Sequence, residues 1–188
     1  LERLQTHSPA KRAIARYAAS LVQDGDTVAL DASTTGLALA KELARRRVTV
    51  VTNGLDCAQE LRAGHAKVIL TGGHLRQVAG SFAGPLALRT LGELRLDCAF
   101  VSAKGVSARD GLMDSDLDEV ALKQGMIAAA ERAVALLDSS KFGRRALGAL
   151  APLSAFALIV SDEGLSADER AALAQADVRS HLVAVSPL

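Results

Sequence analysis

Short apolar runs alternate along the chain with longer segments in which apolar residues recur every three or four positions. The first kind includes Val48–Thr52 and Lys67–Thr71, which are short and rich in β-branched residues, as strands are. The second kind includes Ile14, Ala18 and Val22, which share one face of a helix. The pattern predicts strands at 27–31, 48–52, 67–71, 97–102, 133–138, 156–160 and 178–185, and helices at about 9–23, 37–46, 85–91 and 116–132, with two more capped by Asn53 and Ser166.

Strands and helices that alternate with short connections are typical of a parallel sheet with right-handed crossovers. Because the apolar runs are continuous, helices are expected to cover both faces of the sheet. The predicted fold class is therefore α/β, with a mostly parallel, doubly wound, Rossmann-like sheet and flanking helices. Two stretches interrupt the alternation: 74–84 is predicted as a loop or small hairpin over a cleft, and 103–113 as a loop. The last strand, 178–185, is expected at a sheet edge.

The composition describes a folded domain without a nucleic-acid surface. The 22 basic and 21 acidic side chains leave a formal net charge of +1, and aromatic residues make up 3% with no Trp. DNA binding needs basic patches and base stacking needs aromatic platforms, so the chain by itself is predicted not to bind DNA. No apolar run is long enough to cross a bilayer, which predicts a cytoplasmic chain with no membrane partner. Cys57 and Cys98 lie far apart and the histidines are scattered, so neither a metal nor another cofactor is expected.

Polar residues gather where predicted strands end, which is where open parallel sheets bind ligands. Asp31 is followed by Ser33, Thr34 and Thr35 at the start of a helix, where hydroxyls and backbone N–H groups favour an anion such as phosphate. The alternative is an ordinary helix cap made by one of these hydroxyls. Asn53 follows the next strand, either as a helix cap or as a partner for ligand hydroxyls.

Glycines and basic residues follow the other predicted strands. Gly72 and Gly73 would let the backbone approach a ligand closely, and Arg76 would pair with a phosphate or carboxylate. Lys141 follows a strand-end carboxylate and two hydroxyls; it would meet a phosphate or Asp31, unless it is a solvated turn lysine. Further candidates are Lys104 and Lys123. Because no glycine-rich nucleotide motif and no nucleophile elbow is present, these residues together predict a pocket for a phosphorylated polyol.

Several short motifs, taken in their order and spacing, resemble the C-terminal effector domain of DeoR-family bacterial transcriptional regulators. Each motif alone is weak, but the resemblance covers nearly the whole chain. It is carried by Lys11–Ala15, Asp24–Thr27, Leu30–Thr35, Val50–Asn53, Leu70–Gly73, Leu75–Arg76, Ser81–Pro85 and Leu137–Gly143.

The resemblance implies a role in regulation. Family members carry an N-terminal helix-turn-helix DNA-binding domain and use this C-terminal domain to sense a phosphorylated sugar or related metabolite and to oligomerise. Residues 1–9 are then expected to be the linker from a missing N-terminal helix-turn-helix domain, and residues 10–188 the sensor domain. The expected partners are a phosphorylated sugar effector and other copies of the chain in a dimer or tetramer, with DNA contacted only through the missing domain.

The resemblance also suggests roles for the candidate residues. The hydroxyl loop would hold the phosphate, although Ser33 replaces the Gly usual in the family, and the basic residues would add positive charge. Asp31 and Asn53 would bind sugar hydroxyls. The predicted ligand-binding set is Asp31, Ser33, Thr34, Thr35, Asn53, Gly72, Gly73, Arg76, Lys104, Lys123 and Lys141.

The same domain is similar in fold to ribose-5-phosphate isomerase, which supplies a rival hypothesis. Aldose–ketose isomerisation needs a carboxylate base, and the isomerases carry acidic residues after the strand where this chain has Lys104. A repressor-type sensor without catalytic residues is therefore predicted. The alternatives are an isomerase-like enzyme or its relic, using Asp31 or Glu119, and an oligomerisation module with a vestigial pocket.

Overall fold

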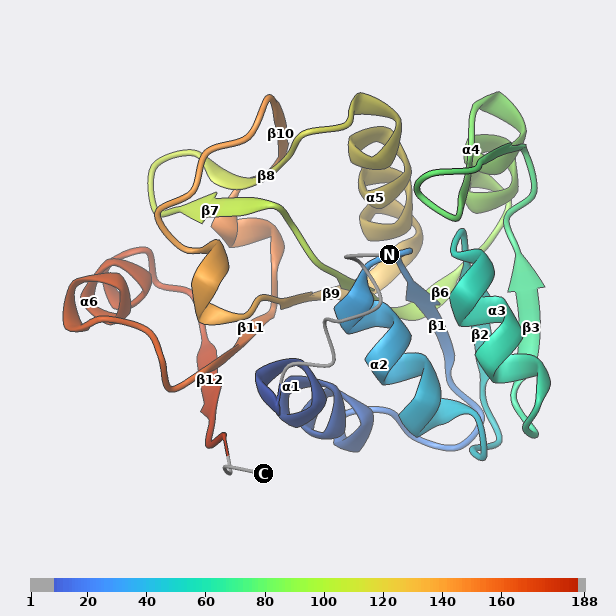
Figure 1. The fold of residues 1–188 in the computed structure, drawn as a ribbon, viewed down its shortest axis with the longest axis horizontal. Coiled ribbons are helices and arrows are strands. Elements are labelled where there is room, and N and C mark those ends of the chain that lie inside the picture. The colour runs from blue at the N-terminus through green and yellow to red at the C-terminus, as the bar shows by residue number, and fades with distance from the viewer. Residues whose placement is uncertain (1–8, 186–188) are drawn as a thin grey trace.

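The computed structural model of the protein describes residues 9–185 and contains a seven-stranded sheet whose strands pair in parallel (Figure 1). The predicted fold class, an α/β chain with a mostly parallel, doubly wound sheet, is confirmed. Strand β12 lies at one edge, as predicted for the last strand. In spatial order the strands are β12 (Ser180–Val183), β11 (Leu158–Asp162), β9 (Ala130–Leu136), β6 (Leu96–Val101), β1 (Thr27–Leu30), β2 (Thr49–Thr52) and β3 (Lys67–Leu70).

Helices cover both faces of the sheet. One face carries α1 (Pro9–Ser20), α2 (Thr34–Leu43) and α3 (Leu55–Arg62), and the other carries α4 (Pro85–Gly92), α5 (Leu117–Ala129) and α6 (Ala167–Gln175). Successive strand side chains point to opposite faces, so Val28 and Leu30 belong to the first core and Ala29 to the second. All three are fully buried. The continuous apolar runs of the sequence are therefore strands buried on both sides.

The order of the strands reverses direction next to β1. The chain runs from β1 through β2 to β3 at one edge, then returns to β6 on the other side of β1 and continues towards β12. In open parallel sheets, ligands bind beyond the carboxyl ends of the two strands that flank such a switch point. Here those ends are followed by Asp31 and Ser102, which places both residues at the expected site.

Two small antiparallel sheets lie outside the main one. The predicted small hairpin at 74–84 is confirmed as β4 (His74–Arg76) paired with β5 (Ser81–Ala83). The prediction of a loop at 103–113 is wrong, because this stretch forms β7 (Gly105–Ser107) and β8 (Gly111–Asp114), which β10 (Gly148–Ala151) completes. These three strands have three or four residues and each begins with Gly, so the sequence contains no apolar run that would predict them.

Several element boundaries differ from the predicted ones. The helix predicted at 116–132 ends at Ala129, because the next residues pair with β6, where Ala130 lies opposite Leu96. The strand predicted at 156–160 lies at Leu158–Asp162, because a 3₁₀ turn, η3 (Leu153–Ala155), comes before it.

The starts of two helices bear on the site. Helix α2 begins at Thr34, earlier than the predicted residue 37, so the hydroxyl residues form its cap and first turn. The expected cap of α3 is wrong: Gly54 occupies that position, and Asn53 is fully buried before it. The expected cap of α6 by Ser166 is confirmed as a capping box with Glu169. Residues 1–8 of the predicted linker lie outside the described part of the chain.

Candidate functional site

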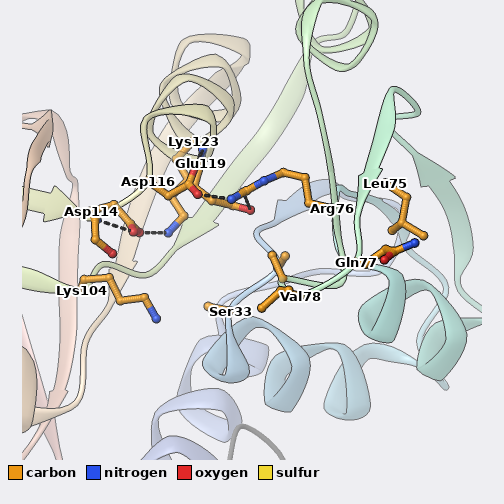
Figure 2. A pocket seen from close by; sticks show the side chains of 13 residues that line it. Ser33, Leu75, Arg76, Gln77, Val78, Lys104, Asp114, Asp116, Glu119 and Lys123 are labelled. Carbon is orange, nitrogen blue, oxygen red and sulfur yellow. Dashed lines mark hydrogen bonds and ion pairs between the residues drawn. The ribbon is translucent and has the colours of Figure 1, made fainter.

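Two adjoining hollows, of about 640 and 670 Å³, open beyond the carboxyl ends of β1 and β6. Their linings share Ser33, Lys104, Asp114 and Lys123, so together they form one candidate site. Figure 2 shows the side of this site formed by α5 and the β4–β5 hairpin, with Ser33 facing them from the loop before α2. We call the hollow lined by Arg76 the first hollow and the one lined by residues of α1 and η2 (Ser139–Lys141) the second hollow.

Asp31 fixes the loop between β1 and α2. One carboxylate oxygen, Oδ1, accepts hydrogen bonds from the Ser33 hydroxyl at 2.5 Å and from the Ser33 N–H at 3.2 Å. The other oxygen, Oδ2, accepts from the Ser102 N–H at 2.8 Å and lies 3.3 Å from the Lys123 ammonium. Asp31 is almost fully buried. Its carboxylate therefore joins the ends of β1 and β6 instead of projecting into the cavity.

Lys123 is a buried cation held by α5 between two carboxylates. Its ammonium lies 2.7 Å from Asp114 Oδ2 and donates to the Ser102 carbonyl at 2.9 Å, in addition to facing Asp31. Burial lowers the pKa of Lys123, but the two carboxylates outweigh it, and the pKa is raised above its usual value. Lys123 is therefore charged, and the network ties β1, β8 and α5 together under both hollows.

The first turn of α2 borders the second hollow. Ser33 is the N-cap, and its Oγ accepts from the Gly36 N–H at 2.9 Å. The capping alternative therefore describes Ser33, whose hydroxyl is used both by the helix and by Asp31. Thr34 and Thr35 follow in the first turn and line the second hollow. A helix leaves its first N–H groups without partners inside the helix, and these groups together with the helix dipole favour an anion there.

Three lysines from separate elements converge on this helix start. Lys11 of α1 donates to Thr34 Oγ1 at 2.9 Å, and Lys104 and Lys141 line the same hollow. Burial lowers the pKa of Lys11. Asp138 opposes this effect, whereas the positive charges of Lys141 and Lys104 lower the pKa of Lys11 further, so both lie near enough to act on Lys11. This corner of the site is electropositive.

The opposite wall, in the first hollow, is rich in carboxylates. The Arg76 guanidinium pairs with Asp116 and lies 3.0 Å from Glu119 Oε1 (Figure 2). Glu119 also accepts from the Ser81 hydroxyl at 2.5 Å and from Asn53 Nδ2 at 3.5 Å. Arg76 therefore joins the β4–β5 hairpin to α5.

The structure brings most of the predicted site residues together. Asp31 supports the cavity from below. Of the alternatives for Lys141, the contact with Asp31 is wrong, because Lys123 occupies that position and the Lys141 ammonium lies 3.9 Å from Asp138. The predicted residues that line the hollows are Ser33, Thr34, Thr35, Arg76, Lys104, Lys123 and Lys141.

Besides Asp31, three predicted residues do not reach the cavity lining. Asn53 is fully buried and donates to the Phe82 carbonyl at 3.3 Å, so it supports the hairpin and has no surface for sugar hydroxyls. Gly72 and Gly73 lie before β4 and have positive φ. A Cβ on Gly73 would lie 2.3 Å from the Ala83 carbonyl oxygen, so this glycine serves the close approach within the hairpin.

Sequence reasoning missed Lys11 and Asp114 as site residues. One signal was available: Lys11 precedes Ile14 by three positions and Ala18 by seven, so it lies on the apolar face of α1, where a lysine is out of place without a partner. Asp114 was hidden because β8, which it ends, was predicted as loop.

Metal and membrane features are absent from the described residues. Within residues 9–185, no group of three or more His, Cys, Asp or Glu side chains is arranged to hold a metal ion. The helices in the same range are too short or too polar to span a membrane.

The fold and the cavity define an α/β domain with a hollow beyond the ends of two central strands and one electropositive corner in that hollow. Residues 6–163 match the DeoR C terminal sensor domain, and the chain belongs to this family.

Relatives of the chain are transcriptional regulators. It is 38% identical over 186 residues to the HTH-type transcriptional regulator YulB of Bacillus subtilis. This alignment covers 98% of this chain and 72% of that protein. The HTH-type transcriptional regulator GolR of Listeria innocua is 37% identical over 83% of this chain and 62% of its own. The transcriptional repressor AccR of Agrobacterium fabrum is 36% identical over 82% of this chain and 61% of its own. The chain thus spans 61% to 72% of the length of these relatives.

Solved structures confirm the expected likeness in fold to ribose-5-phosphate isomerase. The isomerase A of Methanocaldococcus jannaschii matches with a TM-score of 0.53 and 19% identity, over 70% of this chain and 53% of that one. The translation initiation factor eIF-2B of Pyrococcus horikoshii matches with a TM-score of 0.56 and 18% identity, over 83% of this chain and 63% of that one. At these identities the likeness concerns the fold alone.

Proposed function

We propose that the chain is the effector-sensing domain of a transcriptional regulator and that its effector is a phosphorylated sugar. The observation that carries this proposal is the convergence of Lys11, Lys104 and Lys141 on the first turn of α2. A cluster of ammonium groups beside the N-terminus of a helix suits a phosphate better than any neutral group. Without a negatively charged ligand, three neighbouring lysines repel one another.

The two hollows give the ligand an orientation. The phosphate would lie against the first turn of α2 and the lysines, and the sugar would extend towards Asp114 and Glu119. Carboxylate oxygens accept hydrogen bonds from hydroxyls, so this wall suits a polyol. Asp31 and Lys123 form the floor of the cavity. Their polar atoms already bond to each other and to Ser102, so the sugar is expected to contact Asp114 and Glu119 instead.

The signal would pass to DNA through a domain that precedes this one. The matched regulators are longer than this chain, and Lys11 places the first described helix, α1, in contact with the proposed phosphate site. A ligand that binds one arrangement of α1 or of a subunit interface more tightly would shift the population of that arrangement. The proposal includes a homo-oligomer, repression of genes for sugar use, and a cytoplasmic location.

The test is thermal unfolding of the chain with a panel of sugar phosphates, each compared with its unphosphorylated parent. A ligand at about 100 times its Kd adds about 2.7 kcal/mol of stability, which corresponds to roughly 5–10 °C in Tm for a domain of this size. We expect such a shift with a phosphorylated compound and none with its parent. Lys141→Gln is expected to reduce the shift, whereas Lys67→Gln, at an exposed strand position away from the hollows, is expected to retain it.

Two results would contradict the proposal. The first is a panel in which no phosphorylated compound raises the Tm. The second is a shift that Lys141→Gln and Lys67→Gln leave equally intact, since the phosphate would then bind elsewhere.

A second candidate function is sugar-phosphate isomerisation, favoured by three carboxylates, Asp114, Asp116 and Glu119, in the lining of one hollow. A catalytic base must reach a carbon-bound proton of the substrate. The Glu119 carboxylate already pairs with Arg76 and accepts a hydrogen bond from the Ser81 hydroxyl, so it is engaged within the protein. Turnover of an aldose phosphate that Glu119→Gln abolishes would support the enzyme; binding without turnover supports the sensor.

A further inference from the structure

The two hollows differ in charge, and this difference bears on which phosphorylated sugars fit. The second hollow is lined by four lysines and two aspartates, which leave a formal charge of +2. The first hollow has three basic and three acidic side chains and is formally neutral. The charged lining residues are Lys11, Lys104, Lys123, Lys141, Asp56 and Asp114 in the second, and Arg76, Lys104, Lys123, Asp114, Asp116 and Glu119 in the first.

We infer that the site selects sugars that carry a single phosphate and whose far end is neutral or positively charged, and that it rejects ligands with a second anionic group. This inference rests on the proposed function, in which the single phosphate occupies the second hollow.

Two of the three cations of the first hollow, Arg76 and Lys123, are already engaged with carboxylates, and the third, Lys104, also lines the second hollow, where the proposed phosphate lies. Arg76 is shared by Asp116 and Glu119, so this group carries one formal negative charge. Lys123 is shared by Asp114 at 2.7 Å and Asp31 at 3.3 Å, so this group carries another. A second phosphate or a carboxylate in the first hollow would have to displace one of these partners.

Burial strengthens the discrimination. The Glu119 side chain is 13% exposed and the Arg76 side chain 21% exposed, so water screens their charges less than on an open surface. Displacing Glu119 from Arg76 would also remove the positively charged partner of the Glu119 carboxylate. The loss of such a partner is costly in free energy for a charge with little access to water. Hydroxyls and ammonium groups, by contrast, donate to carboxylate oxygens without disturbing these pairs. The carboxylates that line the first hollow therefore favour hydrogen-bond donors over anions.

The test measures dissociation constants by calorimetry for matched probes. Glucose 6-phosphate is compared with 6-phosphogluconate, and fructose 6-phosphate with fructose 1,6-bisphosphate, with inorganic phosphate as the common reference. Each pair differs by one added anionic group. We expect the monophosphate of a pair to bind at least about tenfold more tightly than its partner with two anions, a factor typical of unfavourable charge placement in a partly buried site.

A charge-neutralising variant tests the cause. Asp116→Asn with Glu119→Gln leaves Arg76 without its two carboxylates, and Asn at position 116 preserves the capping of α5. We expect this variant to lose most of the discrimination, because Arg76 can then pair with the second anion. The matched control is Asp118→Asn with Glu131→Gln, which makes the same change in net charge at exposed positions outside both hollows. This control is expected to retain the discrimination against a second anionic group.

The outcomes separate the inference from the proposed function. Equal binding of both members of a pair to the unmodified chain would overturn the inference while leaving the sensor proposal intact. Discrimination that persists unchanged in the Asp116→Asn, Glu119→Gln variant would also overturn it, since the carboxylate wall would then not be its source. Failure of every phosphorylated probe to bind would overturn the proposed function, and the inference with it.

Discussion

Lys11 and Lys123 show how two buried lysines around one cavity acquire opposite properties. Lys123 faces two carboxylates, and its pKa is raised despite burial. Burial lowers the pKa of Lys11, which faces one carboxylate, Asp138, and two other lysines. The first is satisfied by the protein itself, so it serves the structure. The second lies beside the first turn of α2, where the proposal places the phosphate of the effector.

Replacing Lys123 with Met is expected to destabilise the fold. Removing one partner from a buried charge network leaves Asp31 and Asp114 without their shared cation, which costs roughly 3–5 kcal/mol. Denaturant unfolding of this variant beside Lys67→Met, at an exposed position, measures the difference. Because its pKa is raised on folding, the stabilising contribution of Lys123 is present at neutral pH and is lost only as the pH rises through that raised pKa. A loss below about 1 kcal/mol at pH 7 would contradict the assigned role.

The lowered pKa of Lys11 predicts how phosphate affinity depends on pH. Lys11 attracts the phosphate only while protonated, and it loses its proton below the ordinary lysine value of 10.5. Affinity for a bound sugar phosphate is therefore expected to fall as the pH rises from 7 towards 10. An arginine stays charged throughout this range, so Lys11→Arg is expected to hold its affinity to higher pH. Titration calorimetry of both proteins across this range measures the effect; identical pH profiles would contradict it.

At the scale of single elements, the start of α2 depends on a glycine. A Cβ on Gly36 would lie 2.5 Å from the Asp31 carbonyl oxygen and 2.9 Å from its Oδ1. Gly36 also donates its N–H to Ser33, so any displacement disturbs both the cap and the Asp31 contacts. The first turn of α2 is thus pressed against the end of β1, which fixes the proposed phosphate site to the sheet.

Gly36→Ala is accordingly expected to weaken sugar-phosphate binding and lower the Tm, because the helix start must move away from Asp31. Gly92→Ala is the matched control: it lies at the end of α4 with open space around the added Cβ, and a helical Gly→Ala change there is expected to be neutral or slightly stabilising. Thermal unfolding with and without ligand separates the two variants. Unchanged binding in Gly36→Ala would contradict the close contact.

The main elements and the small hairpin at 74–84 were predictable from the sequence, but the strands of the three-stranded sheet were not. Runs such as Val48–Thr52 contain enough β-branched residues to identify strands without any knowledge of their neighbours. Strands β7, β8 and β10 are short, and β10 reaches β8 from a distant part of the chain. The end of α5 was misplaced because Ala130 fits a helix locally, and only its pairing opposite Leu96 makes it a strand residue. Tertiary pairing decided each of these cases.

At the scale of the whole molecule, the candidate site was partly predictable. The hydroxyl loop after Asp31 and the lysine at 141 follow strands, so the rule for parallel sheets located them. The partners of Arg76 were beyond sequence reasoning, because Glu119 is 43 positions away and reaches it only through the packing of the hairpin against α5. Lys11 was missed because a lysine in a surface helix is usually solvated, whereas this one faces Thr34.

The seven-stranded sheet brings these distant residues to one place. The order of strands sets β1 and β6 side by side (Figure 1). Helices α1 and α5 and the segment around η2 each add a charged side chain to the cavity beyond the ends of these strands. The family match gives the class of regulator, and the charge arrangement gives the orientation of the proposed ligand. We propose that a sugar phosphate binds in this cavity with its phosphate at the start of α2.

A crystal structure of the chain with the sugar phosphate that most raises its Tm tests this claim most directly. We predict the phosphate within hydrogen-bond distance of the first-turn N–H groups of α2 and of the ammonium groups of Lys11, Lys104 and Lys141, with the sugar hydroxyls directed towards Asp114 and Glu119. A phosphate bound instead beside Arg76, or anywhere outside the two hollows, would contradict the account.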